Sequence, residues 1–283
     1  MRRTLLSISA LLLSALALSG CAQPSATLPD GVGVTVFQSR FDRGLHQLEI
    51  KVSNDTDAAI TVLSATLDST RFAEPAVWDR PQRVPSGAAR DLRVQLGEPD
   101  CSDTPPRDEV VLEFELSDGS TGTARLPIAD PAPIDAVNAE DCLGAAVATI
   151  VTLSAADTVQ WTPGGQEPAL LDIVATPTGA EGSLTIVESK ATVLLGLVDE
   201  NGVAVYEHPE NLVVDAESGP GVVTLRLVPA RCDPHAVAED KRGTFFPLEV
   251  QTSTGRSGQL YVPVSDDVRA ELYAFFGDYC GLP

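Results

Sequence analysis

Basic residues are scarce in this chain. Its 283 residues include 19 Lys plus Arg against 40 Asp plus Glu, which gives a formal net charge of −21 at pH 7. Proteins that bind the nucleic-acid backbone need a concentrated basic surface to neutralise phosphates. The composition therefore argues against nucleic acid as a partner. Hydrophobic residues make up 43% of the chain, which is enough for packed cores, so the acidity does not indicate disorder.

Side chains suited to soft-metal binding and catalysis are also few. The single methionine is the initiator, and the three histidines, His46, His208 and His235, are scattered. Copper-handling proteins use clusters of these two residue types. The sequence contains no H-E-x-x-H, G-x-S-x-G, S-x-x-K, Walker A or G-x-G-x-x-G pattern. We therefore expect a protein that is not an enzyme and that has no cofactor.

Oxygen ligands are plentiful, which makes calcium the metal to consider. Acidic turns occur at 54–57, 199–202 and 266–267, but none follows the D-x-[DN]-x-[DN]-G spacing of an EF-hand loop. Asp and Asn are favoured in turns because their side chains bond to nearby backbone groups. We therefore expect these residues to shape turns, and we predict no metal site.

The one extended apolar run lies at the N-terminus, from Leu5 to Leu18. Arg2 and Arg3 precede it, and small residues follow it up to Cys21. A basic start, a short apolar core and small residues before a cleavage site are the parts of a secretory signal. Because the run is shorter than the ~20 residues that span a bilayer, the pattern indicates export.

The last of these residues, Leu18-Ser19-Gly20-Cys21, resemble the lipobox of bacterial lipoproteins: an aliphatic residue, a small residue, Gly or Ala, and then Cys. The resemblance implies that the Cys21 thiol carries diacylglycerol and that residues 1–20 are removed. The mature chain would then be anchored to the outer face of the cytoplasmic membrane, stably so because two acyl chains hold it. An ordinary secretory peptide or an uncleaved anchor is the alternative. The preference for Arg over Lys, with abundant Ala, Gly, Pro and Val, is common in high-GC bacteria and points to an actinobacterial source.

Four cysteines are left once Cys21 is assigned to lipid: Cys101, Cys142, Cys232 and Cys280. An even number in an exported chain favours two disulfides over free thiols. Structural zinc draws its ligands from close pairs such as C-x2-C, which this chain lacks. Four cysteines allow three pairings, and their spacing alone does not choose among them.

An internal repeat does choose among the pairings. Segment 112–130 aligns without a gap to segment 248–266, with glycine, proline and aspartate at matching positions. Upstream, segment 48–63 similarly resembles segment 171–187. Two copies of one module explain the repeat, and each copy holds one complete cysteine pair. We therefore predict disulfides between Cys101 and Cys142 and between Cys232 and Cys280.

Most apolar segments alternate with period two, as in strands that have one buried and one solvent-facing side. Leu48, Ile50 and Val52, for example, are separated by charged residues, and turn signals such as Asp118-Gly119 divide the segments. The pattern predicts an all-β chain of two tandem immunoglobulin-like β-sandwich modules. The Cys, Trp and Cys arrangement of antibody domains is absent.

Each module is expected to end in a short helical or irregular extension that its disulfide ties down. In the second module Ser265 is suited to the N-cap of a helix over 265–280. Apolar residues follow at helical spacing: Val268, Leu272, Phe275 and Phe276. The counterpart in the first module, 129–142, contains Pro131 and Pro133 and is predicted to be shorter.

Positive charge is concentrated locally in five arginines: Arg71, Arg80, Arg83, Arg90 and Arg93. Such a patch can bind an anionic partner or lipid headgroups. Because Asp79 and Asp91 lie among these arginines, we expect a solvated face that is paired with nearby acids.

The predicted organisation is a signal peptide at 1–20, the lipidated Cys21 with a flexible tether at 21–30, a first module at 31–145 and a second at 146–283. The second module is expected to open with the apolar run 147–153. We expect a membrane-anchored, extracytoplasmic, non-catalytic lipoprotein that contacts a protein or an envelope polymer. The alternative is a small-molecule or ion-binding accessory of a membrane transporter or enzyme, with a pocket around residues 143–170. An enzyme of unrecognised type would require convergent carboxylates in a deep cleft.

Overall fold

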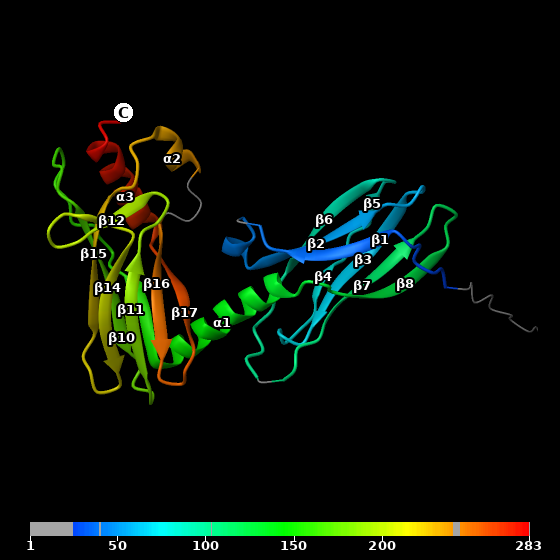
Figure 1. Ribbon diagram of the computed structural model, residues 1–283, viewed down its shortest axis with the longest axis horizontal. Coiled ribbons are helices and arrows are strands. Elements are labelled where there is room, and N and C mark those ends of the chain that lie inside the picture. The colour runs from blue at the N-terminus through cyan, green and yellow to red at the C-terminus, as the bar shows by residue number, and fades with distance from the viewer. Residues whose placement is uncertain (1–24, 40, 103, 240–243, 283) are drawn as a thin grey trace, which may run out of the picture.

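The computed structural model describes residues 25–39, 41–102, 104–239 and 244–282. The predicted signal peptide at 1–20 and the predicted lipid-attachment residue Cys21 lie outside the described residues. Within them, no helix is both long enough and apolar enough to cross a membrane. The described chain forms two β-sandwiches joined by one long helix (Figure 1).

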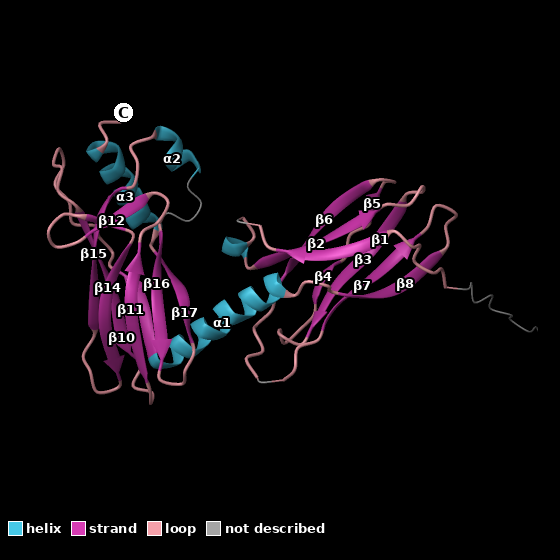
Figure 2. Ribbon diagram, viewed as in Figure 1, coloured by secondary structure: helices cyan, strands magenta, loops and turns pink. Residues whose placement is uncertain are grey.

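Two antiparallel sheets make up the first module (Figure 2). One has the strand order β1-β2-β6, with β1 (Val32–Phe37), β2 (Gln47–Asn54) and β6 (Ala88–Gln95), and the short 3-10 helix η1 (Arg43–Leu45) precedes β2. The other has the order β4-β3-β7-β8, with β3 (Ile60–Ser69), β4 (Ala76–Trp78), β7 (Asp108–Glu115) and β8 (Thr121–Pro127), while β5 (Gln82–Val84) also pairs with β3. Alternate residues of the strands fill the space between the sheets, and Leu48, Ile50, Val52, Leu112 and Phe114 are fully buried there.

The second module also consists of two antiparallel sheets. One sheet has the order β13-β12-β15-β10-β9, with β9 (Val151–Ala155), β10 (Ala169–Pro177), β12 (Leu195–Val198), β13 (Ala204–Val205) and β15 (Gly221–Pro229). The other has the order β14-β11-β16-β17, with β11 (Ser183–Lys190), β14 (Glu207–Asp215), β16 (Phe245–Thr252) and β17 (Ser257–Pro263). A short helix, α2 (Pro234–Glu239), follows β15. The prediction of two tandem immunoglobulin-like β-sandwich modules is confirmed.

The internal repeat corresponds to equivalent hairpins, β7–β8 and β16–β17. Leu112 and Leu248 occupy matching, fully buried positions in the first strand of each. Gly119 (φ 84°) and Gly255 (φ 88°) take the left-handed conformation that each turn requires, which side chains with a Cβ rarely adopt. The two copies therefore share both their register and their turn.

The helix predicted over 265–280 is confirmed. Helix α3 (Asp266–Tyr279) begins after Ser265, whose side-chain oxygen accepts a hydrogen bond from the Val268 amide. Its apolar face is buried in the second core: Val268, Leu272, Phe275 and Phe276. The Trp161 ring packs edge-on against Phe275, with the ring centroids 5.8 Å apart.

The helix after the first hairpin is longer than predicted. Helix α1 (Ala132–Ile150) has 19 residues against 14 in α3, so the prediction that Pro131 and Pro133 leave a shorter helix is wrong. Pro131 is the N-cap of the helix and Pro133 lies in its first turn, where an N–H would have no helical partner and where the fixed φ of proline suits a helix. The run 147–153 does not open the second module as a strand either, because the helix continues to residue 150 and β9 begins after it.

Helix α1 belongs to both modules. Its first half contributes Ile134 and Val137 to the first core, and its second half contributes Leu143, Val147 and Ile150 to the second core. The predicted boundary between residues 145 and 146 therefore falls inside a continuous helix.

Part of the predicted flexible tether at 21–30 lies against the first module. The Ala26 amide donates a hydrogen bond to the Thr121 carbonyl at the start of β8, 2.8 Å away. Only glycine fits at 122, because a Cβ there would collide with the Ala26 carbonyl oxygen and the Phe114 ring. The flexible-tether interpretation therefore does not hold at Ala26, which is bonded to the start of β8. Because β8 runs from there toward α1, this is the end of the sandwich opposite α1 (Figure 1).

Both predicted disulfides are present in the structure. Cys101 bonds to Cys142 within α1, and Cys232 bonds to Cys280 at the end of α3. The bonded residues are 41 and 48 positions apart. In the chain-entropy model, loops of this length stabilise the folded state by about 4 kcal/mol each.

The first prediction concerns these disulfides. Replacing Cys101 and Cys142 together by Ala should lower the local stability of the first module by about 2–5 kcal/mol. Amide hydrogen exchange read by mass spectrometry should show faster exchange in β7, β8 and the first half of α1. The matched pair Cys232→Ala with Cys280→Ala should instead affect α3 and β15. Unchanged protection in the first module would contradict the structural role of its disulfide.

Candidate functional site

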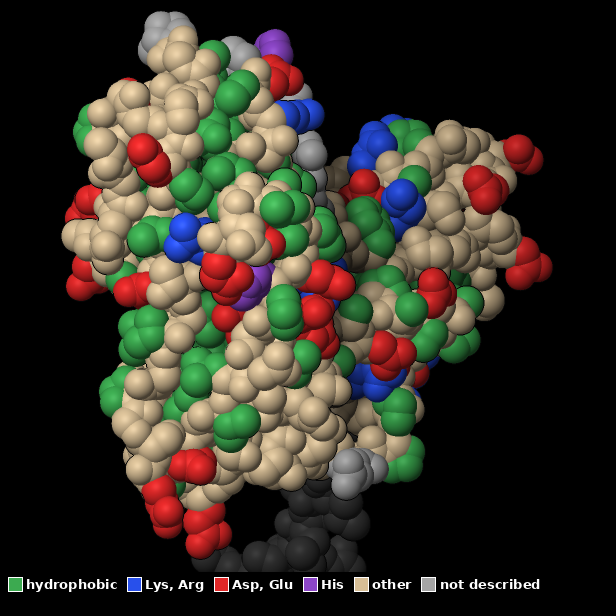
Figure 3. Space-filling model, turned by 60° about the vertical axis from the view of Figure 1, so that its left-hand side comes forward, with side chains coloured by type: hydrophobic (Ala, Val, Ile, Leu, Met, Phe, Trp, Pro, Cys, Tyr) green, Lys and Arg blue, Asp and Glu red, His purple; other side chains and the backbone are tan. Residues whose placement is uncertain are grey.

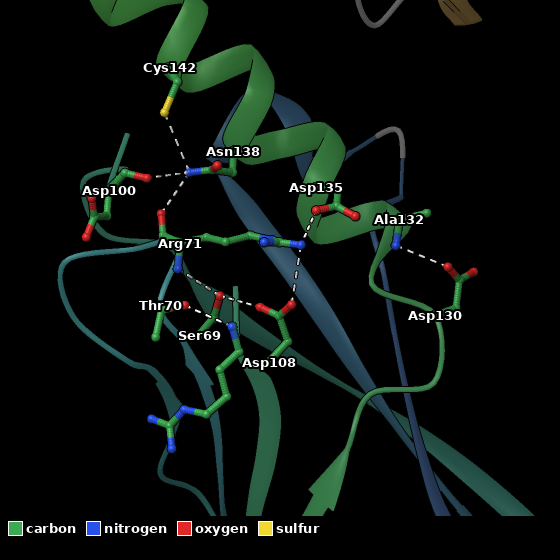
Figure 4. A network of polar contacts seen from close by, with 11 residues as sticks. Ser69, Thr70, Arg71, Asp100, Asp108, Asp130, Ala132, Asp135, Asn138 and Cys142 are labelled. Carbon is green, nitrogen blue, oxygen red and sulfur yellow. Dashed lines mark hydrogen bonds and ion pairs between the residues drawn. The ribbon is translucent and has the colours of Figure 1, made fainter. Parts of the chain in front are cut away.

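Ion pairs and hydrogen bonds join the start of α1 to the first module (Figure 4). The Arg71 guanidinium, whose side chain is only 10% exposed, pairs with Asp108 of β7 at 3.5 Å and with Asp135 of α1. The Asn138 side-chain amide donates to the Arg71 carbonyl at 2.8 Å and to the Asp100 carbonyl at 3.3 Å. These contacts fasten the first half of the helix to the first module beside the Cys101–Cys142 disulfide.

The second module also contacts the first module directly, at Cys101. Nη2 of Arg256, in the turn between β16 and β17, donates a hydrogen bond to the Cys101 carbonyl, 3.1 Å away. The modules are therefore connected by the shared helix, by covalent fastening of that helix, and by this hydrogen bond.

A cleft of about 800 Å³ opens between the modules along α1. The helix forms its floor with Glu140, Asp141, Gly144, Ala145 and Ala148. We call this space the inter-module cleft. Its floor follows one face of the helix, and its last three residues are small, which leaves room above the helix.

The first module supplies one wall of the inter-module cleft. Two segments there lie antiparallel, because the Ala73 amide donates to the Glu98 carbonyl at 2.9 Å and the Asp100 amide donates to the Arg71 carbonyl at 2.8 Å. The residues that line the cleft from this wall are His46, Ala73, Glu74, Leu96, Gly97, Glu98 and Pro99. The opposite wall comes from Leu260 and Tyr261 in β17 of the second module.

Acidic side chains dominate the charge of the inter-module cleft. Glu74, Glu98, Glu140 and Asp141 line it, and no Lys or Arg is among the lining residues that the structure describes. The surface view shows the two lobes with a furrow between them and acidic side chains on both (Figure 3). Nε2 of His46 lies 2.9 Å from Oδ2 of Asp141, which gives that carboxylate a partner.

A smaller cavity of about 230 Å³ adjoins the cleft beside the same helix. Glu140 and Tyr261 line both spaces, and Arg43 of η1 lines the smaller one. Helix η1 therefore places a residue beside each space, since His46, which lines the cleft, directly follows it.

A buried carboxyl pair supports η1. The Ser39 amide donates to Oδ2 of Asp42 at 2.8 Å, and Nε of Arg93 lies 3.2 Å from Oδ1 of the same residue. Burial alone would raise the pKa of Asp42, but hydrogen bonds from Ser39 and Glu49 and the charge of Arg93 outweigh it and lower the pKa. Burial, with the hydrogen bond and charge of Asp42, raises the pKa of Glu49. The pKa values of the two carboxyl groups are therefore shifted in opposite directions.

His208 and the acidic turn that begins at Asp199 have hydrogen-bond partners in the structure. Nδ1 of His208 lies 3.1 Å from Glu210, which also accepts a hydrogen bond from Ser189 at 2.7 Å, while His235 is exposed. Asp199 accepts hydrogen bonds from the backbone of its own turn. Across the described residues, no three His, Cys, Asp or Glu side chains converge as a metal ion would require.

The arginine prediction is partly wrong. Arg71 and Arg93 pair with acids as expected. Arg80 instead stacks on Trp78, with its guanidinium 4.0 Å from the ring centroid, and Arg83 and Arg90 have no ion pair within the part of the chain that the structure describes. Asp91, which directly follows Arg90 in sequence, instead lies 3.9 Å from Nζ of Lys51.

The pocket predicted around residues 143–170 overlaps the inter-module cleft only at its floor. Of the range 143–170, where a pocket is predicted, Gly144, Ala145 and Ala148 line it. Glu74, Glu98 and Tyr261 come from segments far apart in the chain, so no sequence spacing brings them together. The small residues of α1 are a detectable signal once the segment is taken as a helix.

No protein-family model matches this chain, and no curated protein matches it. Among solved structures it is similar to red sea bream transglutaminase, at 13% identity and a TM-score of 0.24, over 84% of this chain and 32% of that one. It is also similar to the YadV chaperone, at 7% identity and a TM-score of 0.22, over 82% of this chain and 100% of that one. The B domain of a biofilm associated protein is similar at 10% identity and a TM-score of 0.22, over 84% of this chain and 86% of that one. Superpositions at these TM-scores carry no argument about function.

The second prediction concerns the joint. Asn138→Ala should reduce stability by about 0.5–1.5 kcal/mol, because two hydrogen bonds are lost while the Arg71 carbonyl keeps the Asp100 amide as a donor and the Asp100 carbonyl is exposed. Denaturant unfolding followed by hydrogen exchange in α1 measures the loss. Ala139→Ser, a neighbouring change that removes none of these hydrogen bonds, is the control. Equal stability of the wild-type chain and Asn138→Ala would contradict the bracing role of Asn138.

The third prediction concerns pH. Because its pKa is raised in the folded state, Glu49 stabilises the fold while it is protonated, and this contribution is lost as the pH rises through the raised pKa. Glu49→Gln keeps a donor for Asp42 but cannot ionise. The melting temperature of the variant relative to the wild-type chain should therefore increase as the pH rises from acid to neutral. A difference that stays constant over this range would overturn the assignment.

Proposed function

We propose that this protein is a membrane-anchored, extracytoplasmic lipoprotein without catalytic activity, which contacts a protein or a polymer of the cell envelope. The observation that carries the proposal is the sequence Leu18-Ser19-Gly20-Cys21 after a basic and apolar start. Two disulfides support the same location, because disulfides persist in oxidising surroundings outside the cytoplasm.

The position of Ala26 gives the anchored molecule an orientation. Five residue steps separate Cys21 from Ala26, and an extended chain spans at most about 17 Å over that length. Ala26 is bound to Thr121 at the end of the first sandwich opposite α1. A lipid on Cys21 would therefore hold this end near the membrane, and the inter-module cleft and second module would project away from it.

A binding role fits the described polar groups better than catalysis does. Asp42 and Glu49 are buried carboxyls that hydrogen-bond to each other, yet neither lines the inter-module cleft or the adjoining cavity. Their contacts with Ser39 and Arg93 support η1. We assign them a structural role.

A second candidate function is favoured by one observation. The inter-module cleft lies where a ligand-binding accessory of a membrane transporter or enzyme would need a pocket, and its volume of about 800 Å³ is within the range of small-molecule sites. Its open shape between two walls suits an extended segment as well as a small molecule.

The fourth prediction tests anchoring. Cys21→Ser should abolish incorporation of a clickable fatty-acid analogue and release the protein from the membrane fraction, because the thiol that carries lipid is gone. Ser19→Ala keeps a small residue at its lipobox position and should be labelled like the wild-type chain. Persistent membrane attachment of Cys21→Ser without labelling would sink the lipoprotein proposal and favour an uncleaved anchor.

A further inference from the structure

We propose that the side of the first module formed by β5 and β6 docks an extended acidic segment of a partner protein. We call this surface the arginine edge and define it by Arg80, Arg83 and Arg90. The inference identifies a partner for the proposed lipoprotein and, for its location outside the cell, rests on that proposed function. It is carried by the register of the strands, by the charge of the three arginines, and by the apolar side chains beside them.

Two extended segments lie side by side along the arginine edge. Strands β4 and β5 follow each other along β3, and β6 runs antiparallel beside them (Figure 1). Backbone hydrogen bonds join the segments at both ends: the Ala73 amide donates to the Glu98 carbonyl at 2.9 Å, and the Ala88 amide donates to the Pro85 carbonyl at 3.2 Å. The residues between these bonds therefore lie along one side of the sandwich.

Arginines are placed on both segments. Arg80 lies just before β5, Arg83 lies within it, and Arg90 lies in β6 across the turn at 85–88. Strand β6 is the last strand of its sheet, and no described strand pairs with its outer edge. An extended peptide can lie along such an edge and bond to its free backbone groups. The arginines thus form a row of positive charge along a strand edge.

The three arginines have no acidic partner among the described residues. All three are exposed, in a chain whose acidic residues outnumber its basic ones by 40 to 19. Exposed Arg107, by contrast, lies 3.5 Å from Glu109, and Asp91 of β6 lies 3.9 Å from Nζ of Lys51. An acidic segment would therefore find guanidinium groups without carboxylate partners, which can bind a carboxylate through two parallel hydrogen bonds.

The side chains around the row favour a protein as the occupant. Val77 is 51% exposed. The Arg80 guanidinium stacks on the Trp78 ring, 4.0 Å from its centroid, and the Trp78 indole N–H donates to the Arg80 carbonyl at 2.6 Å. These contacts hold Arg80 in position before a partner binds. Because tryptophan and arginine dominate the binding energy of many protein interfaces, the composition of the edge suits a protein partner.

Nearby acids disfavour a membrane as the occupant. The turn at 85–88 lies at the end of the module where the Ser86 hydroxyl donates to the Thr56 carbonyl at 2.6 Å. Asp55 and Asp57 are exposed at that end and form no ion pair with a described residue. An anionic lipid surface that approached from this end would meet both carboxylates, whereas a peptide along β5 and β6 would pass beside them.

The test uses the full-length protein in detergent and a fluorescent peptide with glutamate at alternate positions. Fluorescence anisotropy at physiological ionic strength gives the Kd, because charges more than about 8 Å away are then largely screened. Arg83→Gln with Arg90→Gln should weaken binding at least about fivefold, through loss of two charge-assisted contacts. Arg107→Gln with Arg125→Gln makes the same change in net charge at exposed positions beside β7 and β8, and should stay within about twofold.

Two further variants change the affinity in opposite directions. Arg80→Gln removes the stacked guanidinium and should weaken binding about threefold to fivefold. Asp79 is exposed next to Arg80, and Asp79→Asn removes a carboxylate that repels the peptide, so this variant should tighten binding about twofold. Unchanged melting temperatures confirm that each variant is folded.

The inference is overturned by equal weakening in the Arg107/Arg125 control, by unchanged binding in Arg83→Gln with Arg90→Gln, or by equal affinity for a peptide with glutamine in place of glutamate. Stronger competition by inorganic polyphosphate than by the unlabelled peptide would assign the edge to a phosphate polymer instead. Sedimentation of Cys21→Ser with anionic phospholipid vesicles, if it required Arg83 and Arg90, would assign the edge to lipid. Cys21→Ser should bind the peptide as the wild-type chain does, so failure of peptide binding and failure of membrane anchoring are separate outcomes.

Discussion

Burial of one helix in two cores is the constraint on which the rest of this structure depends. Ile134 and Val137 pack into the first sandwich, and Leu143, Val147 and Ile150 pack into the second. Withdrawing a buried aliphatic side chain from a core costs about 1.5–3 kcal/mol. Neither module can rotate away from α1 without exposing several such side chains, so the helix fixes the position of the walls on either side of it. The inter-module cleft is a consequence of that arrangement.

Buried and exposed carboxyl groups of this acidic chain differ in their partners. Inside the first module each buried acid has a partner: Arg71 neutralises Asp108, and Arg93 approaches both Asp42 and Glu49. Burial and the neighbouring Asp42 raise the pKa of Glu49. Along the inter-module cleft the carboxylates of Glu74 and Glu98 stay exposed and form no ion pair with any described residue.

Duplication explains the two sandwiches, but the copies have diverged at their C-terminal helices. Helices α1 and α3 both follow the repeated hairpin, and each carries the second cysteine of its module. Helix α3 packs only into the core of its own module, whereas α1 extends beyond its cysteine and enters the next one. The equivalent helix therefore packs into one module as α3 but connects two modules as α1.

The sequence alone determined the strands, the two hairpins, the disulfide pairing and helix α3, because these depend on local signals. Period-two alternation, turn glycines such as Gly119 and Gly255, and the Ser265 cap act over a few residues. Only the tertiary structure decided the extent of α1. Pro131 and Pro133 are compatible with the start of a helix, and the β-branched Val147 and Ile150 favour a strand locally but pack from the helix into the second core. The inter-module cleft also depends on the tertiary structure. Its floor and walls combine α1 with Glu74, Glu98 and Tyr261, which no spacing in the chain relates, and they meet because one helix is shared by two cores.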